Sequence, residues 1–324
     1  MPAETMLRRI AESRWAANAR ANRLRQGVIY GVLSYGLWGL IPLYFKLVAD
    51  VGPLEVLAQR IIWAWVLLAV VITLVRRWGD VGPALRSKPI MLALGTSTVL
   101  LAFNWFVYIH AVTTNQIVDA SLGYFLNPLV NVLLGVVILG ERLRRWQTAG
   151  IALAGVGVAI LGAPWIAVSL ALSFAFYGLL RKLVAVDGLL ALFVETLLLA
   201  PVALAFVGYL QATGAGVFVT SNPAMCFTLM ASGVVTCGPL LLFGAAARRL
   251  RFATLGILQY LAPTIQFLLA VFLFGEPLST TKLMALCFIW TAVAIYAIES
   301  LRILNSERNA ARQAERIQPA PADV

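Results

Sequence analysis

Between Gly27 and Ile298 the chain is a succession of apolar runs, each about 20 residues long and separated by short connectors. An α-helix rises ~1.5 Å per residue, so about 20 apolar residues cross a bilayer core ~30 Å thick. The pattern therefore predicts an all-α integral membrane protein with ten transmembrane helices. We expect them at residues 27–48, 54–75, 89–112, 117–139, 146–163, 164–181, 188–209, 223–244, 253–275 and 278–298.

The basic residues follow the same alternation. Of the 25 Lys and Arg residues, all but Lys46, Arg60 and Lys282 fall in the tails or at alternate connectors, on one side of a ten-span chain. The positive-inside rule makes that side cytoplasmic, together with both termini. This topology accounts for the net charge of +11 without a nucleic-acid partner. With 61% hydrophobic and 12% charged residues, the composition also excludes a soluble domain.

The second half of the chain repeats features of the first. The segment Leu33-Ser-Tyr-Gly-Leu-Trp-Gly-Leu40 recurs as Leu172-Ser-Phe-Ala-Phe-Tyr-Gly-Leu179, roughly 140 residues later. Because each unit holds five spans, an odd number, the second unit enters the membrane from the opposite side. Such inverted-topology repeats are typical of secondary transporters. We expect a basic N-terminal tail (1–26), two five-helix repeats (27–163 and 164–298) and a C-terminal tail (299–324).

Polar side chains inside apolar helices need a partner, a cavity or a role. The fourth span carries Ser121, Tyr124, Asn127 and Asn131, whose spacing of three, three and four places them on one helical face. This stripe predicts either a ligand cavity or hydrogen bonds between helices. A cavity with aromatic walls and neutral polar groups suits small, mostly uncharged or zwitterionic organic molecules. The predicted cavity residues are Tyr35, Trp38, Asn104, Trp105, Tyr124, Asn127, Asn131, Tyr177, Gln259 and Gln266.

Ionisable residues in or near the spans are candidates for gating or ion coupling. A buried acid can carry a coupling proton, although structural pairing explains such a group equally well. Glu141 and Glu276 each follow a glycine at a helix end, where we expect them to anchor a gate or a loop. The gating or coupling candidates are Glu55, Arg60, His110, Asp119 and Glu195.

Several catalytic and cofactor motifs are absent from the chain. It contains no GxxxxGK[ST] motif for ATP and no HExxH, GxGD, DDxxD or GxSxG motif. We therefore expect no catalytic residues, no cofactor and no metal site.

Three segments carry a family resemblance: Ser121-Leu-Gly-Tyr-Phe-Leu-Asn-Pro-Leu-Val130, Phe174-Ala-Phe-Tyr-Gly178, and Thr254-Leu-Gly with Gln259-Tyr260 and Pro263-Thr264. They resemble the RarD group of the EamA family, in the drug/metabolite transporter superfamily. The resemblance implies a bacterial inner-membrane transporter with ten helices in two inverted repeats. It also implies that spans five and ten are peripheral. The chain departs from the family pattern at Gln59, where members carry His, and at His110, where they carry Trp.

These observations predict a secondary transporter that works by alternating access and exports a small organic metabolite or drug. Its partners would be that small molecule, the lipid bilayer and, as a candidate coupling ion, the proton. An uncoupled channel or facilitator stays open as an alternative. A membrane-embedded enzyme or scaffold has less support, because no reactive pair of ionisable residues stands out at suggestive spacing.

Overall fold

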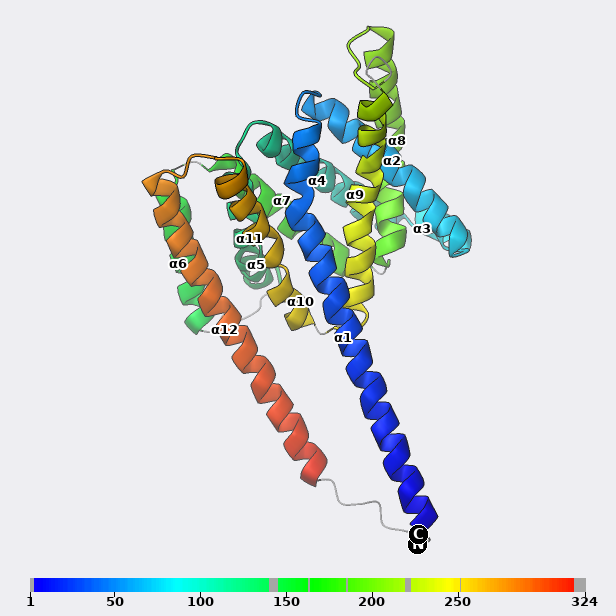
Figure 1. Cartoon of the computed structure of the whole chain (residues 1–324), viewed down its shortest axis with the longest axis vertical. Coiled ribbons are helices and arrows are strands. Elements are labelled where there is room, and N and C mark those ends of the chain that lie inside the picture. Colours follow the sequence, from blue (N-terminus) through cyan, green and yellow to red (C-terminus); the bar gives the residue numbers. More distant parts are fainter. Residues whose placement is uncertain are drawn as a thin grey trace.

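The computed structural model describes residues 3–139, 145–162, 164–184, 186–218, 223–250 and 252–317. Within these ranges every regular element is a helix (Figure 1). The helices are α1 (Ala3–Leu47), α2 (Pro53–Leu74), α3 (Trp78–Arg86), α4 (Lys88–Thr113), α5 (Ile117–Leu139), α6 (Arg145–Ile160), α7 (Trp165–Leu183), α8 (Gly188–Ala212), α9 (Pro223–Ala247), α10 (Phe252–Leu258), α11 (Leu261–Leu268), η1 (Leu269–Leu273) and α12 (Thr280–Ile317).

The fold is that of an all-α membrane protein. Eight helical segments in the described ranges are long and apolar enough to cross a bilayer, and Trp165–Arg181 is a shorter apolar helix. Large apolar side chains cover the outside of the bundle, for example Phe272, Leu74 and Leu92, which are 79%, 76% and 76% exposed. Such a surface requires lipid rather than water around it. The count of ten spans stays a prediction, because α6 has only 16 residues and the apolar helix Trp165–Arg181 is also short.

Three features of the helices add to the sequence-based description. Residues of the predicted N-terminal tail are helical, since α1 begins at Ala3 and runs unbroken into the first span. Likewise α12 continues to Ile317, well beyond its membrane segment. A short helix, α3, follows α2 where a connector was predicted.

The ninth span is broken into shorter helices. It consists of α10, a turn at Gln259 and Tyr260, α11, and the π-helical η1. Pro263 has no N–H to donate to the carbonyl of Gln259, which is the helical partner one turn earlier, so the regular helix is interrupted there. Broken helices of this kind are tolerated in membranes where they line protein or a cavity.

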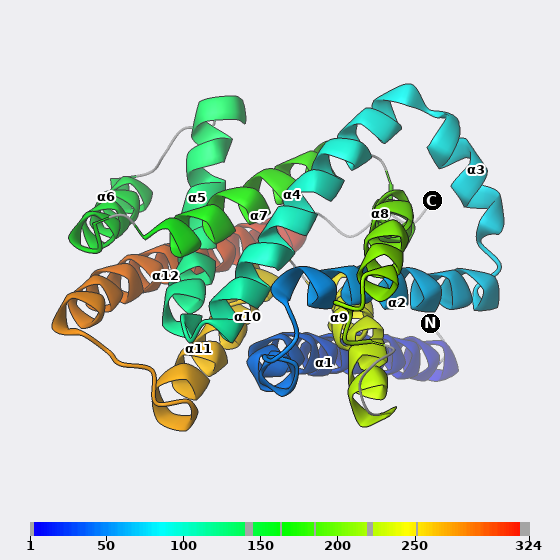
Figure 2. The same ribbon diagram turned by 90° about the horizontal axis from the view of Figure 1, so that it is seen from above.

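The two halves of the chain interlock rather than forming separate bodies. Helix α9 packs on α1 and α2, α8 packs on α2, and α7 packs on α4 and α5. Figure 2 shows α4, α5 and α7 in the middle of the molecule, with α6 and α12 together at one edge. Helices α6 and α12 pack mainly on each other. This peripheral position of the fifth and tenth predicted spans is the one that the family resemblance implies.

The bundle has two ends. One carries the turns after α1, α4 and η1 and is called the Glu276 end below. The opposite end carries the turn between α2 and α3 and the start of α8, and is called the Arg77 end. Helices α1 and α12 both extend past the bundle at the same end (Figure 1).

Candidate functional site

The buried polar groups centre on Arg60, which lies roughly 10 Å along α2 from its first residue. The side chain is 6% exposed, and its Nε donates to Thr236 Oγ1 of α9 at 2.8 Å. Its Cζ lies 4.2 Å from the ring centroid of Trp105 and 5.5 Å from that of Phe45. Nη1 has no hydrogen-bond partner within the described part of the chain. A buried charge costs several kcal/mol, and stacking on Trp105 recovers about 2 kcal/mol of it.

Three helices bring neutral polar groups towards Arg60. Asn104 Nδ2 of α4 donates to Ser173 Oγ of α7 at 2.9 Å, and its Oδ1 accepts from Tyr124 Oη of α5 at 3.4 Å. The ring of Tyr124 lies 5.7 Å from that of Tyr108. Both tyrosines are close enough to interact electrostatically with Arg60. The sequence-predicted residues Asn104, Trp105 and Tyr124 therefore gather around this cation.

A second group of predicted residues lies where α1, α9 and α11 meet. Tyr35 and Trp38 have ring centroids 5.4 Å apart, and both contact Phe243 of α9, at 6.1 Å and 5.9 Å. Gln266 Nε2 donates to the carbonyl of Trp38 at 3.1 Å. Gln266 Oε1 is buried without a partner among the described residues. Gln266 Oε1 is thus a hydrogen-bond acceptor, free among the described residues, beside the rings of Tyr35 and Trp38.

The polar stripe of the fourth span does not act as one unit. Asn127 is 6% exposed and its Oδ1 has no partner in the described ranges, whereas Ser121 donates to the Val118 carbonyl of its own helix. Asn131 is exposed, and Gln259 is half-buried at the turn after α10. Among Ser121, Asn127, Asn131 and Gln259, Asn127 therefore best meets the requirements of a binding residue.

Glu195 of α8 is fully buried, accepts hydrogen bonds from neutral hydroxyls and interacts electrostatically with Arg181 of α7. One carboxylate oxygen accepts from Ser97 Oγ of α4 at 2.6 Å and the other from Tyr177 Oη of α7 at 3.4 Å. The ring of Tyr177 lies 5.9 Å from Phe174, which in turn lies 6.3 Å from Tyr124. A row of aromatic rings therefore connects Glu195 with the surroundings of Arg60.

At the Glu276 end, buried carboxylates hold helix ends and connectors together. Glu276 is 6% exposed, and its two oxygens accept from the backbone N–H groups of Ile117 and Val118 at 2.8 Å and 2.9 Å. These are N–H groups of the first turn of α5 that lack partners within the helix. Beside them, Lys282 Nζ lies 2.9 Å from Asp119 Oδ2. The expectation that Glu276 anchors a gate or loop agrees with this geometry, while Glu141 lies outside the described residues.

Two further candidates lie at the same end. Glu55 accepts from the backbone N–H groups of Val217 and Phe218 in the connector before α9, at 2.9 Å and 3.0 Å. The ring of His110 packs 6.3 Å from Phe106 and 5.7 Å from Trp165. Glu55 therefore ties α2 to a connector, and His110 takes part in an aromatic contact.

The Arg77 end is closed by an ionic contact. Arg77 Nη2 lies 2.6 Å from Asp187 Oδ2 and 2.7 Å from Asp80 Oδ2. Asp187 also caps α8 by accepting from Leu189 N at 3.1 Å. Partial burial by itself would raise the pKa of Asp187, but the hydrogen bonds from Arg77 and the backbone outweigh it and hold this pKa below its ordinary value.

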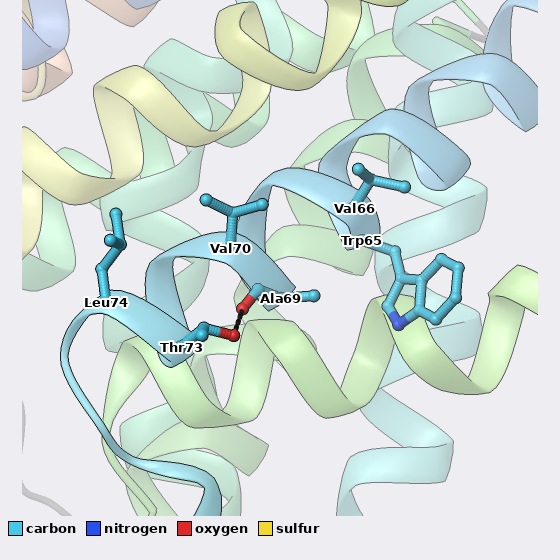
Figure 3. A pocket seen from close by; sticks show the side chains of 6 residues that line it. All are labelled: Trp65, Val66, Ala69, Val70, Thr73 and Leu74. Atoms are coloured by element: carbon cyan, nitrogen blue, oxygen red, sulfur yellow. Dashed lines mark hydrogen bonds between the residues drawn. The ribbon is translucent and has the colours of Figure 1, made fainter.

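An open recess of about 350 Å³ on α2 is separate from these groups (Figure 3). It is lined by Trp65, Val66, Ala69, Val70, Thr73 and Leu74. The one hydroxyl there, on Thr73, donates to the carbonyl of Ala69 at 2.8 Å. Because its lining is almost entirely apolar and comes from a single helix, the recess lacks the groups that would orient a polar substrate.

Sequence reasoning missed several partners in the site. Thr236, Ser97 and Tyr44 are hydroxyl residues in apolar helices, and no pattern singles them out. Tyr44 Oη donates to the carbonyl of Thr228 and lies within electrostatic range of Arg60. Arg60 itself was expected at a gate, and the structure gives it the central place among the buried polar groups.

Comparison with known proteins agrees with this architecture. Residues 25–163 match the model of the EamA-like transporter family. A Pseudomonas aeruginosa protein named "Uncharacterized transporter PA0485" is 43% identical over 293 residues, 88% of this chain and 97% of the relative. Protein RarD of Escherichia coli K12 is 40% identical over 287 residues, 87% and 97% of the two chains. One solved crystal structure superposes with a TM-score of 0.55 at 20% identity, over 86% of this chain and 98% of the other.

The helical membrane fold and the names of the relatives define the class: this is a bacterial multi-pass membrane transporter. More narrowly, the chain belongs to the EamA-like transporter family and, within it, to the RarD group.

Proposed function

We propose that the chain is a secondary transporter that moves a small organic molecule by alternating access. The observation that carries the proposal is the position of the Arg60 cluster, which is buried between two ends that are each held by polar contacts. Glu276 holds the first turn of α5 at one end, and Arg77 pairs with Asp187 at the other. Alternating access needs a site that each end can close in turn, and these contacts are reversible closures of that kind.

The topology that goes with this function has ten spans in two inverted repeats, 27–163 and 164–298. The family match over residues 25–163 supports the first repeat as a unit. The shared end of the α1 and α12 extensions supports an even number of spans (Figure 1). The charge bias of the connectors supports a cytoplasmic location for this end, and the bacterial relatives support an inner-membrane location for the protein. Export is the proposed direction of transport.

An uncoupled channel is the main competing function. A channel needs a continuous polar path, whereas Arg60 and Asn127 are each only 6% exposed. An enzymatic role has less support, because Arg60 and Glu195 have separate sets of partners and form no reactive pair. The buried cluster therefore favours a transporter that opens stepwise.

Protons are the candidate coupling ion, and Glu195 is the carboxylate best suited to carry them. Glu55 and Glu276 accept from backbone N–H groups, and Asp119 pairs with Lys282. By contrast, Glu195 accepts only from side-chain hydroxyls among the bonds described for it, and these can reorient when a proton arrives. A Glu195→Gln variant should transport without responding to a collapsed proton gradient. An undiminished response in that variant would exclude Glu195 as the carrier.

Untargeted metabolite profiling of medium and cytosol tests the proposal. Cells would produce the wild type, Asn127→Leu or Val137→Leu at matched membrane levels. Val137 is a suitable control because it lies on the same helix and is 71% exposed to the surroundings of the bundle. We expect a compound enriched outside the cells with the wild type and Val137→Leu, and not with Asn127→Leu. Equal profiles for all three would remove Asn127 from the pathway and argue against export.

A further inference from the structure

Among the residues that the structure describes, Arg60 is a buried cation without a buried counter-charge. In the described part of the chain the ion pairs involve Arg77 and Lys282, and both lie away from it. Its one hydrogen bond goes to a neutral hydroxyl, on Thr236, and Nη1 has no partner in the described residues. A charged side chain at this depth is retained where it has a functional role. Since the described residues supply no counter-charge, water or a ligand is left to serve as the partner of Arg60.

The surroundings of Arg60 hold its guanidinium in place and leave one edge free. The Trp105 ring at 4.2 Å covers a face of the group, and Thr236 fixes Nε. A guanidinium presents its N–H groups in a rigid fork whose spacing matches the two oxygens of a carboxylate. Tyr108 adds a second donor nearby, since its hydroxyl is buried and without a partner among the described residues.

The charges around Arg60 restrict the ligand further. Its electrostatic neighbours in the described residues are Tyr44, Tyr108, Tyr124 and Cys237, with no second cation and no acid. One cation balances one negative charge, so a dianion would remain half unpaired. The ammonium group of a zwitterion would find no acidic partner. The rings of Phe45 and Trp105 instead offer apolar and aromatic contact to an uncharged body.

We infer that the substrate is a small organic monocarboxylate, held by Arg60 through its carboxylate and by the surrounding rings through an apolar or aromatic body. This inference rests on the proposed transport function and names the chemical class of its substrate. It replaces the neutral or zwitterionic substrate that the sequence alone favours, because the pattern of residues did not reveal that Arg60 lacks a counter-charge.

Ligand binding to the purified full-length protein in lipid nanodiscs tests the inference. The probes are benzoate and a set of small aromatic and aliphatic monocarboxylates, each compared with its own carboxamide, and tryptophan fluorescence reports the dissociation constant. We expect at least one carboxylate to bind at least tenfold more tightly than its amide in the wild type. Arg60→Gln should abolish this preference, and Arg60→Lys should weaken it, because lysine lacks the planar fork. Arg86→Gln, which removes an exposed arginine of α3, should leave it unchanged.

Melting temperatures separate a binding role from a structural one. Because Arg60→Gln removes an unpaired buried charge, the ligand-free variant should melt within a few degrees of the wild type. If it does not fold, the weaker binding of Arg60→Lys still decides the matter. Equal affinities for carboxylates and amides, no binding by any carboxylate of the set, or an unchanged preference in Arg60→Gln would each overturn the inference.

Failure of the inference can be distinguished from failure of the proposed function. Export of a neutral compound that persists in Arg60→Gln would support the transport function and overturn the inference that the substrate is a monocarboxylate. Binding of a carboxylate that depends on Arg60, without any flux across sealed vesicles, would support the site and contradict transport.

Discussion

The contact between Glu276 and α5 gives the most specific prediction about how the protein closes. Gly275 adopts φ +64°, a conformation that favours glycine, and the residue after it turns its carboxylate to the first turn of α5. Both oxygens accept backbone N–H groups, from Ile117 and Val118. Replacing Glu276 by Gln keeps one acceptor and turns the other into a donor that faces an N–H group.

The expected loss follows from these bonds. A hydrogen bond to a charged group contributes about 1.5–3 kcal/mol, and an anion at a helix N-terminus adds about 0.3–1 kcal/mol. Glutamine retains part of the first contribution, so we expect Glu276→Gln to weaken closure of this end by about 2–3 kcal/mol. At about 1.4 kcal/mol per factor of ten, opening becomes about 30- to 140-fold more frequent.

Hydrogen–deuterium exchange of the amides of Ile117 and Val118 measures this opening directly. Asp119→Asn is the matched control on the same helix, since it also removes one carboxylate. Its carboxylate pairs with the partly exposed Lys282, a contact worth less than about 1 kcal/mol, so exchange should rise no more than about fivefold. Similar exchange rates in both variants, or no acceleration in Glu276→Gln, would refute the closing role of Glu276.

Two further predictions concern packing and pH. A Cβ added by Gly233→Ala would lie 2.5 Å from the backbone oxygen of Trp63, so this variant should lose about 1–3 kcal/mol of stability, whereas Gly244→Ala, with nothing within 4 Å, should not melt lower than the wild type. A gain in melting temperature for Gly233→Ala would contradict the close approach of α9 to α2. At the Arg77 end, the lowered pKa of Asp187 means that its pairing contributes at neutral pH and is lost as the pH falls below the ordinary value of 3.8. Acidification should therefore lower the protection factors of the amides at the start of α8, which relate the intrinsic to the observed exchange rate at each pH, by less than about fivefold, because the pair is partly exposed. Asp187→Asn should remove this pH dependence.

The membrane helices could be predicted from the sequence because the bilayer imposes their length and composition. The predicted spans at 54–75, 89–112 and 117–139 begin and end within one residue of α2, α4 and α5. The sequence does not tell which of the two membrane prolines, Pro128 or Pro263, breaks its helix, since a proline inside a membrane helix can leave it continuous. Pro128 does so in α5. The outcome depends on the neighbouring helices, which local sequence does not describe.

The candidate site was predictable in part for a related reason. Helical spacing tells which side chains of one helix share a face, and the polar and aromatic character of Asn104, Trp105 and Tyr124 marked them as cavity candidates; these three lie in one buried cluster. It does not tell which groups on another helix they meet. The hydroxyl of Thr236, 176 residues from Arg60 in the chain, could not be assigned to it without the packing of α2 on α9. For the same reason Asn131 was expected beside Asn127, although it is exposed in the structure.

The central claim is that a solute crosses the membrane through the buried cluster around Arg60. The most direct test is flux of the compound found by metabolite profiling, measured with purified protein in sealed vesicles and compared with protein-free vesicles. We predict protein-dependent flux in the wild type that is lost in Asn127→Leu and retained in Val137→Leu. Flux that equals that of protein-free vesicles, or that persists undiminished in Asn127→Leu, would contradict the account.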